Sequence, residues 1–84
     1  MIVAICDEEL LGRVLEEGEL RLEVSRDFYG GKRVPISLIH QFISEGTVIN
    51  LIGNKVVREA SKRNKLILDV AIKVGGVLHV QIYK

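Results

Sequence analysis

The sequence predicts an α/β fold of the α+β kind, with a single mixed β-sheet packed with three short helices in the order β-α-β-α-β-α-β-β. Residues 2–5 form an unbroken apolar run, which is typical of a strand covered on both faces. Residues 19–25 alternate between apolar and polar side chains, which is the period of a strand with one wet face. Three further segments carry helical apolar stripes that are too short to be stable unless they pack on a sheet.

The first predicted strand, residues 2–5, is followed by the first predicted helix. Asp7 offers a carboxylate that could cap this helix, and Glu8 and Glu9 would lie in its first turn, where the helix dipole favours anions. Gly18 is expected to end the helix with a left-handed residue. The apolar stripe of this helix would consist of Leu10, Leu11, Val14 and Leu15.

Residues 19–25 form the second predicted strand, and a loop over residues 26–34 follows it. Within this loop we expect Phe28 to anchor the chain to the core, whereas Tyr29 could be either an anchor or a ligand contact. Pro35 suits the first turn of a second helix. The buried stripe and the closing glycine of that helix would be Ile36, Ile39, Phe42, Ile43 and Gly46.

Residues 47–52 are rich in β-branched and apolar side chains, which predicts a central strand. The Gly-Asn pair at 53–54 then turns the chain into a third helix. Two alternating runs, 70–74 and 77–83, flank the glycine pair at 75–76 with the spacing of a two-residue hairpin loop. The third helix would face the core with Val56, Val57 and Ala60.

The length and the composition limit the class of protein. A chain of 84 residues suits one compact domain over residues 1–84. Cys6 is the only cysteine, which excludes an internal disulfide and multi-cysteine zinc patterns, so we expect a reducing, cytoplasmic setting. The opening apolar run is too short for a signal peptide or a membrane span. We therefore expect no membrane partner, and we expect no metal site and no cofactor.

Several ordered blocks of the chain carry a family resemblance. They are the segments 6–12, 15–18, 22–25, 28–31, 50–53 and 75–81. Together they resemble an archaeal family known as domain of unknown function 424 (DUF424). The resemblance implies an uncharacterised archaeal protein of the cytosol, loosely associated with translation genes and without a catalytic signature.

Two departures from the family pattern bear on the sheet. Leu78 stands where the family has a proline, and the strand that precedes residues 2–5 in longer members is not expected here. The predicted sheet would then have an exposed edge, and such edges tend to pair with another chain. A homo-oligomer formed through this edge is one consequence that the sequence leaves open.

Polar residues at strand ends and in loops form the candidate site for a ligand or partner. A thiol at a helix start can have a lowered pKa, but the neighbouring carboxylates disfavour a thiolate, so we favour Cys6 as a small core residue. A pair between Cys6 and His79 would require their strands to be neighbours. The candidate site residues are Cys6, Asp7, Tyr29, Gly30, Gly31, Asn50, His79 and Gln81.

A dense basic run follows the central strand and forms a candidate surface for nucleic acid. Its members are Lys55, Arg58, Lys62, Arg63 and Lys65. Spacings of three and four place the first three on one helical face, where they could meet phosphates. We favour a solvated helix face instead, because the helix dipole already rewards cations near a helix end. Nucleic-acid binding here would be weak and salt-sensitive, since no aromatic platform accompanies the charges.

Two function classes remain. No nucleophile, base and orienting group can be assembled from motif spacing, so we favour a non-enzymatic binding module that contacts a protein, RNA or the ribosome. The alternative is a small enzyme or ligand-binding protein built around the junction of Cys6 and Asp7, together with Asn50 and His79.

Overall fold

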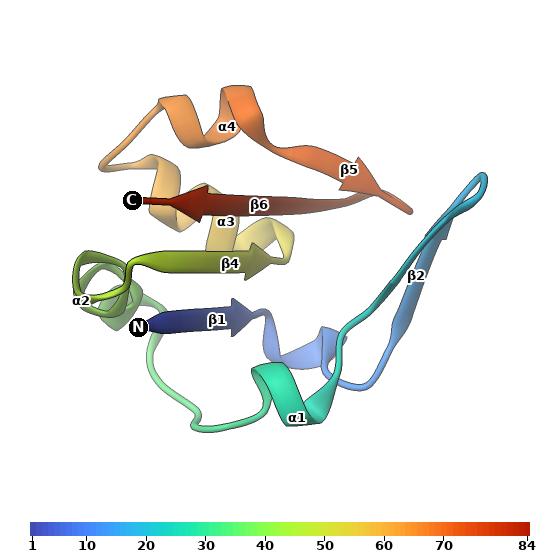
Figure 1. The fold of residues 1–84 in the computed structure, drawn as a ribbon, viewed down its shortest axis with the longest axis horizontal. Coiled ribbons are helices and arrows are strands. Elements are labelled where there is room, and N and C mark those ends of the chain that lie inside the picture. Colours follow the sequence, from blue (N-terminus) through green and yellow to red (C-terminus); the bar gives the residue numbers. More distant parts are fainter.

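The computed structural model describes residues 1–84, and its main sheet has four strands. Strand β1 (Ile2–Cys6) pairs in parallel with β4 (Val48–Ile52). Strand β6 (Val77–Tyr83) pairs antiparallel with β4 on one side and with β5 (Ile72–Val74) on the other. The spatial order is therefore β1-β4-β6-β5 (Figure 1). The predicted α+β class with a mixed sheet is confirmed, and residues 48–52 of the expected range 47–52 form a central strand.

A separate β-hairpin replaces the first predicted helix. Strand β2 (Val14–Glu17) pairs antiparallel with β3 (Leu20–Glu23), and Gly18, at φ 60°, begins the two-residue turn between them. The helix predicted before Gly18 is wrong, and the sheet is not single. Gly12, at φ 86°, interrupts the helical stripe, and the chain before it forms only a 3-10 turn, Glu8–Leu10. Leu10 and Leu15 of the predicted stripe are buried, but Val14 is exposed, and the stripe does not form a helix.

Two of the three predicted helices are present. Helix α2 (Ile39–Glu45) follows a 3-10 turn, and α3 (Asn54–Ser61) follows β4 directly. Helix α4 (Leu66–Val70) and helix α1 (Arg26–Tyr29) were not predicted. Helix α1 lies in the segment predicted as a loop, where the Ser25 hydroxyl caps it by accepting from the backbone N–H of Asp27. None of the helices has the length and apolar character that crossing a bilayer requires.

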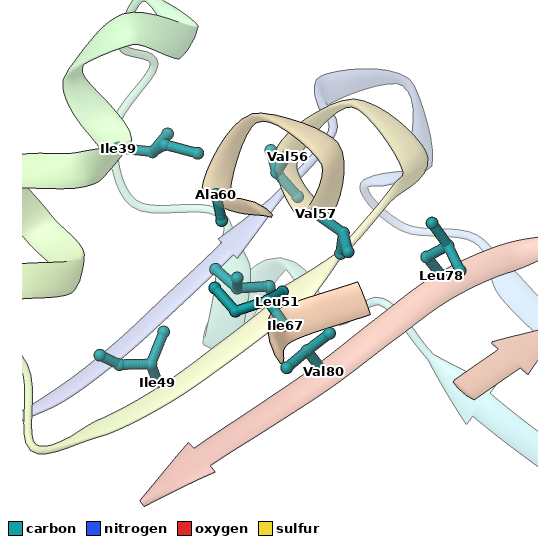
Figure 2. Close-up of a cluster of buried hydrophobic side chains, with 9 residues drawn as sticks. All are labelled: Ile39, Ile49, Leu51, Val56, Val57, Ala60, Ile67, Leu78 and Val80. Atoms are coloured by element: carbon teal, nitrogen blue, oxygen red, sulfur yellow. The ribbon is translucent and has the colours of Figure 1, made fainter. Parts of the chain in front are cut away.

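The main core lies between the sheet and helices α2, α3 and α4 (Figure 2). Alternate residues of β4 and β6 face the helices, since successive side chains of a strand point to opposite faces. The three predicted core residues of α3 all lie in it. The buried set is Ile39, Ile49, Leu51, Val56, Val57, Ala60, Ile67, Leu78 and Val80.

The opposite face of the sheet is covered only at one end. There the β2–β3 hairpin and the turn before it pack on the sheet through Leu10, Leu15, Val24, Ile52 and Val74. We call this set the hairpin core. At the other end of the same face, the side chains of Ile2 and Tyr83 are exposed. The two glycines between β5 and β6, at φ 59° and 81°, form the predicted hairpin turn.

Candidate functional site

Strand β1 is an edge strand with an open row of backbone groups. Its only partner is β4, where the backbone N–H of Asp7 donates to the carbonyl of Ile52 (3.1 Å) and the Met1 carbonyl accepts from Val48 (3.2 Å). Alternate residues of a strand direct their backbone groups to opposite sides. The backbone N–H and C=O groups of Ile2, Ala4 and Cys6 therefore point away from β4. No other segment forms a hydrogen bond with them.

A hollow of about 1210 Å³ runs along this open edge. It lies between β1, continued to Glu9, and the segment 28–36 that leads from α1 back to α2 (Figure 1). We call it the β1 groove. Side chains of α2 and α3 line it on the helical side of the sheet, and Phe28, which is 49% exposed, lines it on the other. Its volume exceeds the roughly 300–1,000 Å³ typical of small-molecule pockets.

Asp7 lies at the end of the β1 groove, and its carboxylate caps α3. One oxygen accepts from the backbone N–H of Val56 (2.9 Å) and the other from that of Lys55 (3.1 Å). Gly53, at φ 127°, occupies the N-cap position without a side chain, and a Cβ there would lie 2.3 Å from the Asp7 carboxyl carbon. The prediction that Asp7 caps the next segment is wrong, because that segment is a 3-10 turn whose amides it does not bond.

Tyr29, Asn50 and His79 form a polar cluster on the sheet face beside the groove. The Asn50 Oδ1 accepts from the Tyr29 hydroxyl and from His79 Nε2, which lies 3.1 Å away. The amide oxygen can only accept, so Nε2 carries the proton of the neutral imidazole. Burial lowers the pKa of His79. Burial also raises the pKa of Tyr29 to about 12, and the nearby Cys6 contributes to that increase. Both groups therefore stay neutral near pH 7.

The thiol of Cys6 is half-buried against the hairpin core. Burial raises its pKa, and the charges of Asp7 and Glu9 raise it further. Strand β4 separates β1 from β6, so Ile52 stands between Cys6 and His79 in the register. The Cys-His pair that neighbouring strands would have allowed does not form.

The predicted site residues divide between the groove and the sheet face. The groove is lined by Cys6, Asp7, Tyr29, Gly30 and Gly31. On the sheet face, Asn50 and His79 are bonded as described, and Gln81, opposite Asn50 in the register, is exposed outside the groove. The structure thus brings together most of the set, with Tyr29 joining its two parts.

The basic run is only partly free of acidic partners. Lys55 lines the β1 groove and pairs with Glu9 (3.3 Å), while Lys62 pairs with Glu59 (2.9 Å). The other cations of the run are exposed, form no ion pair and do not line the groove: Arg58, Arg63 and Lys65. The predicted nucleic-acid surface is therefore not part of the groove, apart from Lys55.

Sequence reasoning missed three basic residues and assigned the wrong aromatic anchor. Arg26, Lys32 and Arg33 line the β1 groove, and their positive charges within residues 1–46, which are acidic on balance, were the available signal. Tyr29, rather than Phe28, is the anchor, since it packs against the hairpin core and bonds Asn50. A four-residue helix gave no periodicity from which to tell the two rings apart.

The fold and the groove define a class: α+β proteins whose mixed sheet has helices on one face and an open edge strand beside a groove. The chain belongs to the family described as "Protein of unknown function (DUF424)", whose model matches residues 1–84, so the predicted family is confirmed. It is similar to a solved structure described as an uncharacterized conserved protein from Methanopyrus kandleri, with 33% identity and a TM-score of 0.68. The match covers 96% of this chain and 79% of that one. No curated protein matches.

Proposed function

We propose that the protein is a non-enzymatic binding module that holds an extended segment of another protein along the outer edge of β1. One observation carries the proposal: the unpaired backbone groups of β1 form one wall of the large groove. An added strand would gain a ladder of backbone hydrogen bonds from Ile2, Ala4 and Cys6. This is strand addition at a sheet edge, a recurrent mode of peptide recognition.

The two sides of the groove support an extended occupant. Successive side chains of an added strand would point alternately to the two faces of the sheet. On the helical face they would meet Ile39, Phe42 and Val56, and on the other face Phe28 and Tyr29. Apolar contacts on both faces give such a segment side-chain selectivity in addition to its backbone bonds.

An enzymatic use of the Cys6-Asp7 junction has less support. Asp7 is 7% exposed, and its carboxylate already accepts two backbone hydrogen bonds, so it is poorly placed to act as a base. A raised thiol pKa and the separation from His79 both disfavour a nucleophilic Cys6. The pairing of Lys55 and Lys62 with glutamates likewise favours a protein partner over RNA.

We place this activity in the cytoplasm of an archaeon, in contact with proteins or ribonucleoproteins near the translation apparatus. The Methanopyrus kandleri neighbour and the single cysteine support this setting.

The test uses peptides from a displayed library of random linear sequences, selected on the wild-type protein. Ala4→Pro removes an outward backbone N–H from β1, and a proline is tolerated on an edge strand at such a position. We expect Ala4→Pro to reduce the binding of selected peptides at least tenfold, because it deletes a ladder bond and obstructs close approach. In the wild type, bound peptide should shift the amide resonances of Ile2, Ala4, Cys6 and the segment 28–36.

The matched control is Lys73→Pro on the other edge strand, β5. Lys73 lies opposite Leu78 in the register of β5 and β6. The backbone N–H of Leu78 donates to the Asn54 side chain and its carbonyl accepts from Gly53, so these groups point away from β5. The backbone N–H of Lys73 correspondingly points away from β6, as that of Ala4 points away from β4. This variant should bind peptides like the wild type. Equal binding by the Ala4→Pro variant, amide shifts away from β1, or a homodimer that occupies the edge would each overturn the proposal. Salt-dependent retention of RNA without peptide binding would do the same.

A further inference from the structure

We infer that the segment held in the β1 groove is acidic where it passes the carboxyl end of β1 and apolar where it passes the start of that strand. This inference rests on the proposed function and adds the chemistry of the partner. It follows from how charged and apolar side chains are divided along the groove.

The start of β1 lies beside apolar groups. Helix α2 lies next to the beginning of β1 (Figure 1), and it contributes Ile39 and Phe42 to the groove, with Ile36 from the preceding turn. The ion pairs that line the groove, Glu8 with Arg33 and Glu9 with Lys55, lie at the other end of the strand. An occupant passing here meets aliphatic and aromatic surface, so it gains most from apolar side chains.

The far end of the groove carries the charges. Glu8 and Glu9 follow β1 directly, and Arg33 and Lys55 face them from the segment 28–36 and from α3. In total the groove is lined by four cations against three carboxylates: Arg26, Lys32, Arg33 and Lys55 against Asp7, Glu8 and Glu9.

All three carboxylates of the groove already have partners. Glu8 pairs with Arg33 through a contact of 2.5 Å, Glu9 pairs with Lys55, and Asp7 accepts the backbone amides at the start of α3. They therefore present little free negative charge to an occupant, and their cationic partners are equally engaged.

Two cations of the groove have no partner. Arg26 and Lys32 form no ion pair and no side-chain hydrogen bond. A smaller hollow next to Arg26 is lined by Glu23 and Asp27, so part of the field of Arg26 is balanced from that side. Lys32 is exposed and stands next to Arg33, whose side chain reaches Glu8 beyond the end of β1. A carboxylate on the bound segment would complete the charge pairing that the chain leaves open.

The test compares peptides selected for binding with their neutral counterparts. Selection on the wild type should enrich aspartate and glutamate at one end of the peptides, and replacing those residues by asparagine or glutamine should weaken binding. The variant Lys32→Glu should bind a selected acidic peptide roughly three- to tenfold more weakly at low salt, an effect that shrinks as salt is added.

Arg63→Glu is the matched control for the charge reversal, because Arg63 is exposed, unpaired and outside the groove. It changes the net charge by the same amount and should leave the affinity unchanged.

The outcomes separate the two proposals. Peptides that bind along β1 but show no acidic preference, or equal affinities for Lys32→Glu and Arg63→Glu, would overturn this inference and leave the proposed function intact. Failure to select any peptide that depends on Ala4 would overturn the proposed function, and this inference with it.

Discussion

Asp7 determines the local structure at the end of the β1 groove. Its two carboxylate oxygens satisfy backbone amides that the first turn of any helix leaves without intrahelical partners. The residue at the N-cap position, Gly53, cannot do so because it has no side chain. The close approach of Asp7 in turn requires that side chain to be absent. Asp7 and Gly53 therefore function as one unit, although they are 46 positions apart in the printed sequence.

Replacing Asp7 with alanine removes the cap of α3. Because Asp7 is 7% exposed, the freed amides of Lys55 and Val56 cannot all regain water. We expect the free energy of unfolding to fall by about 2 kcal/mol, measured by urea denaturation. Glu19→Ala, in the exposed turn of the hairpin, is the control and should change stability by less than about 0.5 kcal/mol. Similar values for the two variants would show that the cap contributes little.

Gly53→Ala tests the other half of the same unit. The new Cβ would lie 2.3 Å from the Asp7 carboxyl carbon, and φ at this position is 127°, which L-residues rarely adopt. Strain and overlap together should lower the free energy of unfolding by about 3 kcal/mol or more. At Gly31 a Cβ meets nothing within 4 Å, so Gly31→Ala should be close to neutral. Thermal unfolding of the two variants makes the comparison.

His79 gives the protein a pH-dependent stability. Burial holds its folded-state pKa below the ordinary value of 6.5, so the unfolded chain takes up the proton first as the pH falls. The contribution of His79 is full above pH 6.5 and is lost as the pH falls from 6.5 through the folded-state pKa. We expect His79→Gln to reduce the loss of stability over this window, followed by urea midpoints at a series of pH values. An unchanged pH profile would contradict the assignment.

At the scale of elements, periodicity predicted the strands better than the helices. The central strand β4, the final hairpin and helices α2 and α3 were predicted because their patterns are long or are bounded by glycine and proline. The stripe over residues 10–15 failed because two leucines at a spacing of five can be buried from a turn and a strand as well as from a helix. Cross-strand pairing of Leu15 with Leu22 decided the outcome.

The hairpin core depends on one leucine of β2. Leu15 is 5% exposed, and Leu15→Ala should lower the free energy of unfolding by about 2–4 kcal/mol through lost burial and a residual cavity. Leu66→Ala in α4 is the matched control, because that side chain is 67% exposed and should contribute little. Denaturant unfolding of both variants compares the free energy lost at the buried leucine with that lost at the exposed one. Equal losses would mean that the hairpin does not pack on the sheet as described.

The candidate site was predicted only in part, for reasons of topology. The sequence identified Cys6, Asp7 and the segment 28–31, which do line the β1 groove. The sequence pattern does not predict the order of strands in a sheet, so it could not show that β4 separates Cys6 from His79. The unpaired cations were also missed, because a lysine in a loop has no periodicity that marks it as part of a groove.

At the scale of the whole molecule, the two edges of β1 should differ in hydrogen exchange. The backbone amides of Val3 and Ile5 point toward β4, whereas those of Ala4 and Cys6 have no partner. The amides of Ala4 and Cys6 should therefore exchange much faster than those of Val3 and Ile5, and the amides of the central strand β4 should exchange slowest. Exchange followed by NMR tests this directly. Strong protection at Ala4 would mean that the outer edge is covered in solution.

The cap that Asp7 provides also constrains the route by which the chain folds. Helix α3 has eight residues, fewer than the roughly 12–15 at which an isolated helix is even marginally stable. Its first turn is completed by a carboxylate 48 and 49 positions away, so no local segment can finish it. Joining the two requires a large loop to close first, which is slow for a domain rich in such distant contacts. The start of α3 should consequently become ordered only after β1 and β4 have paired, late in the folding reaction.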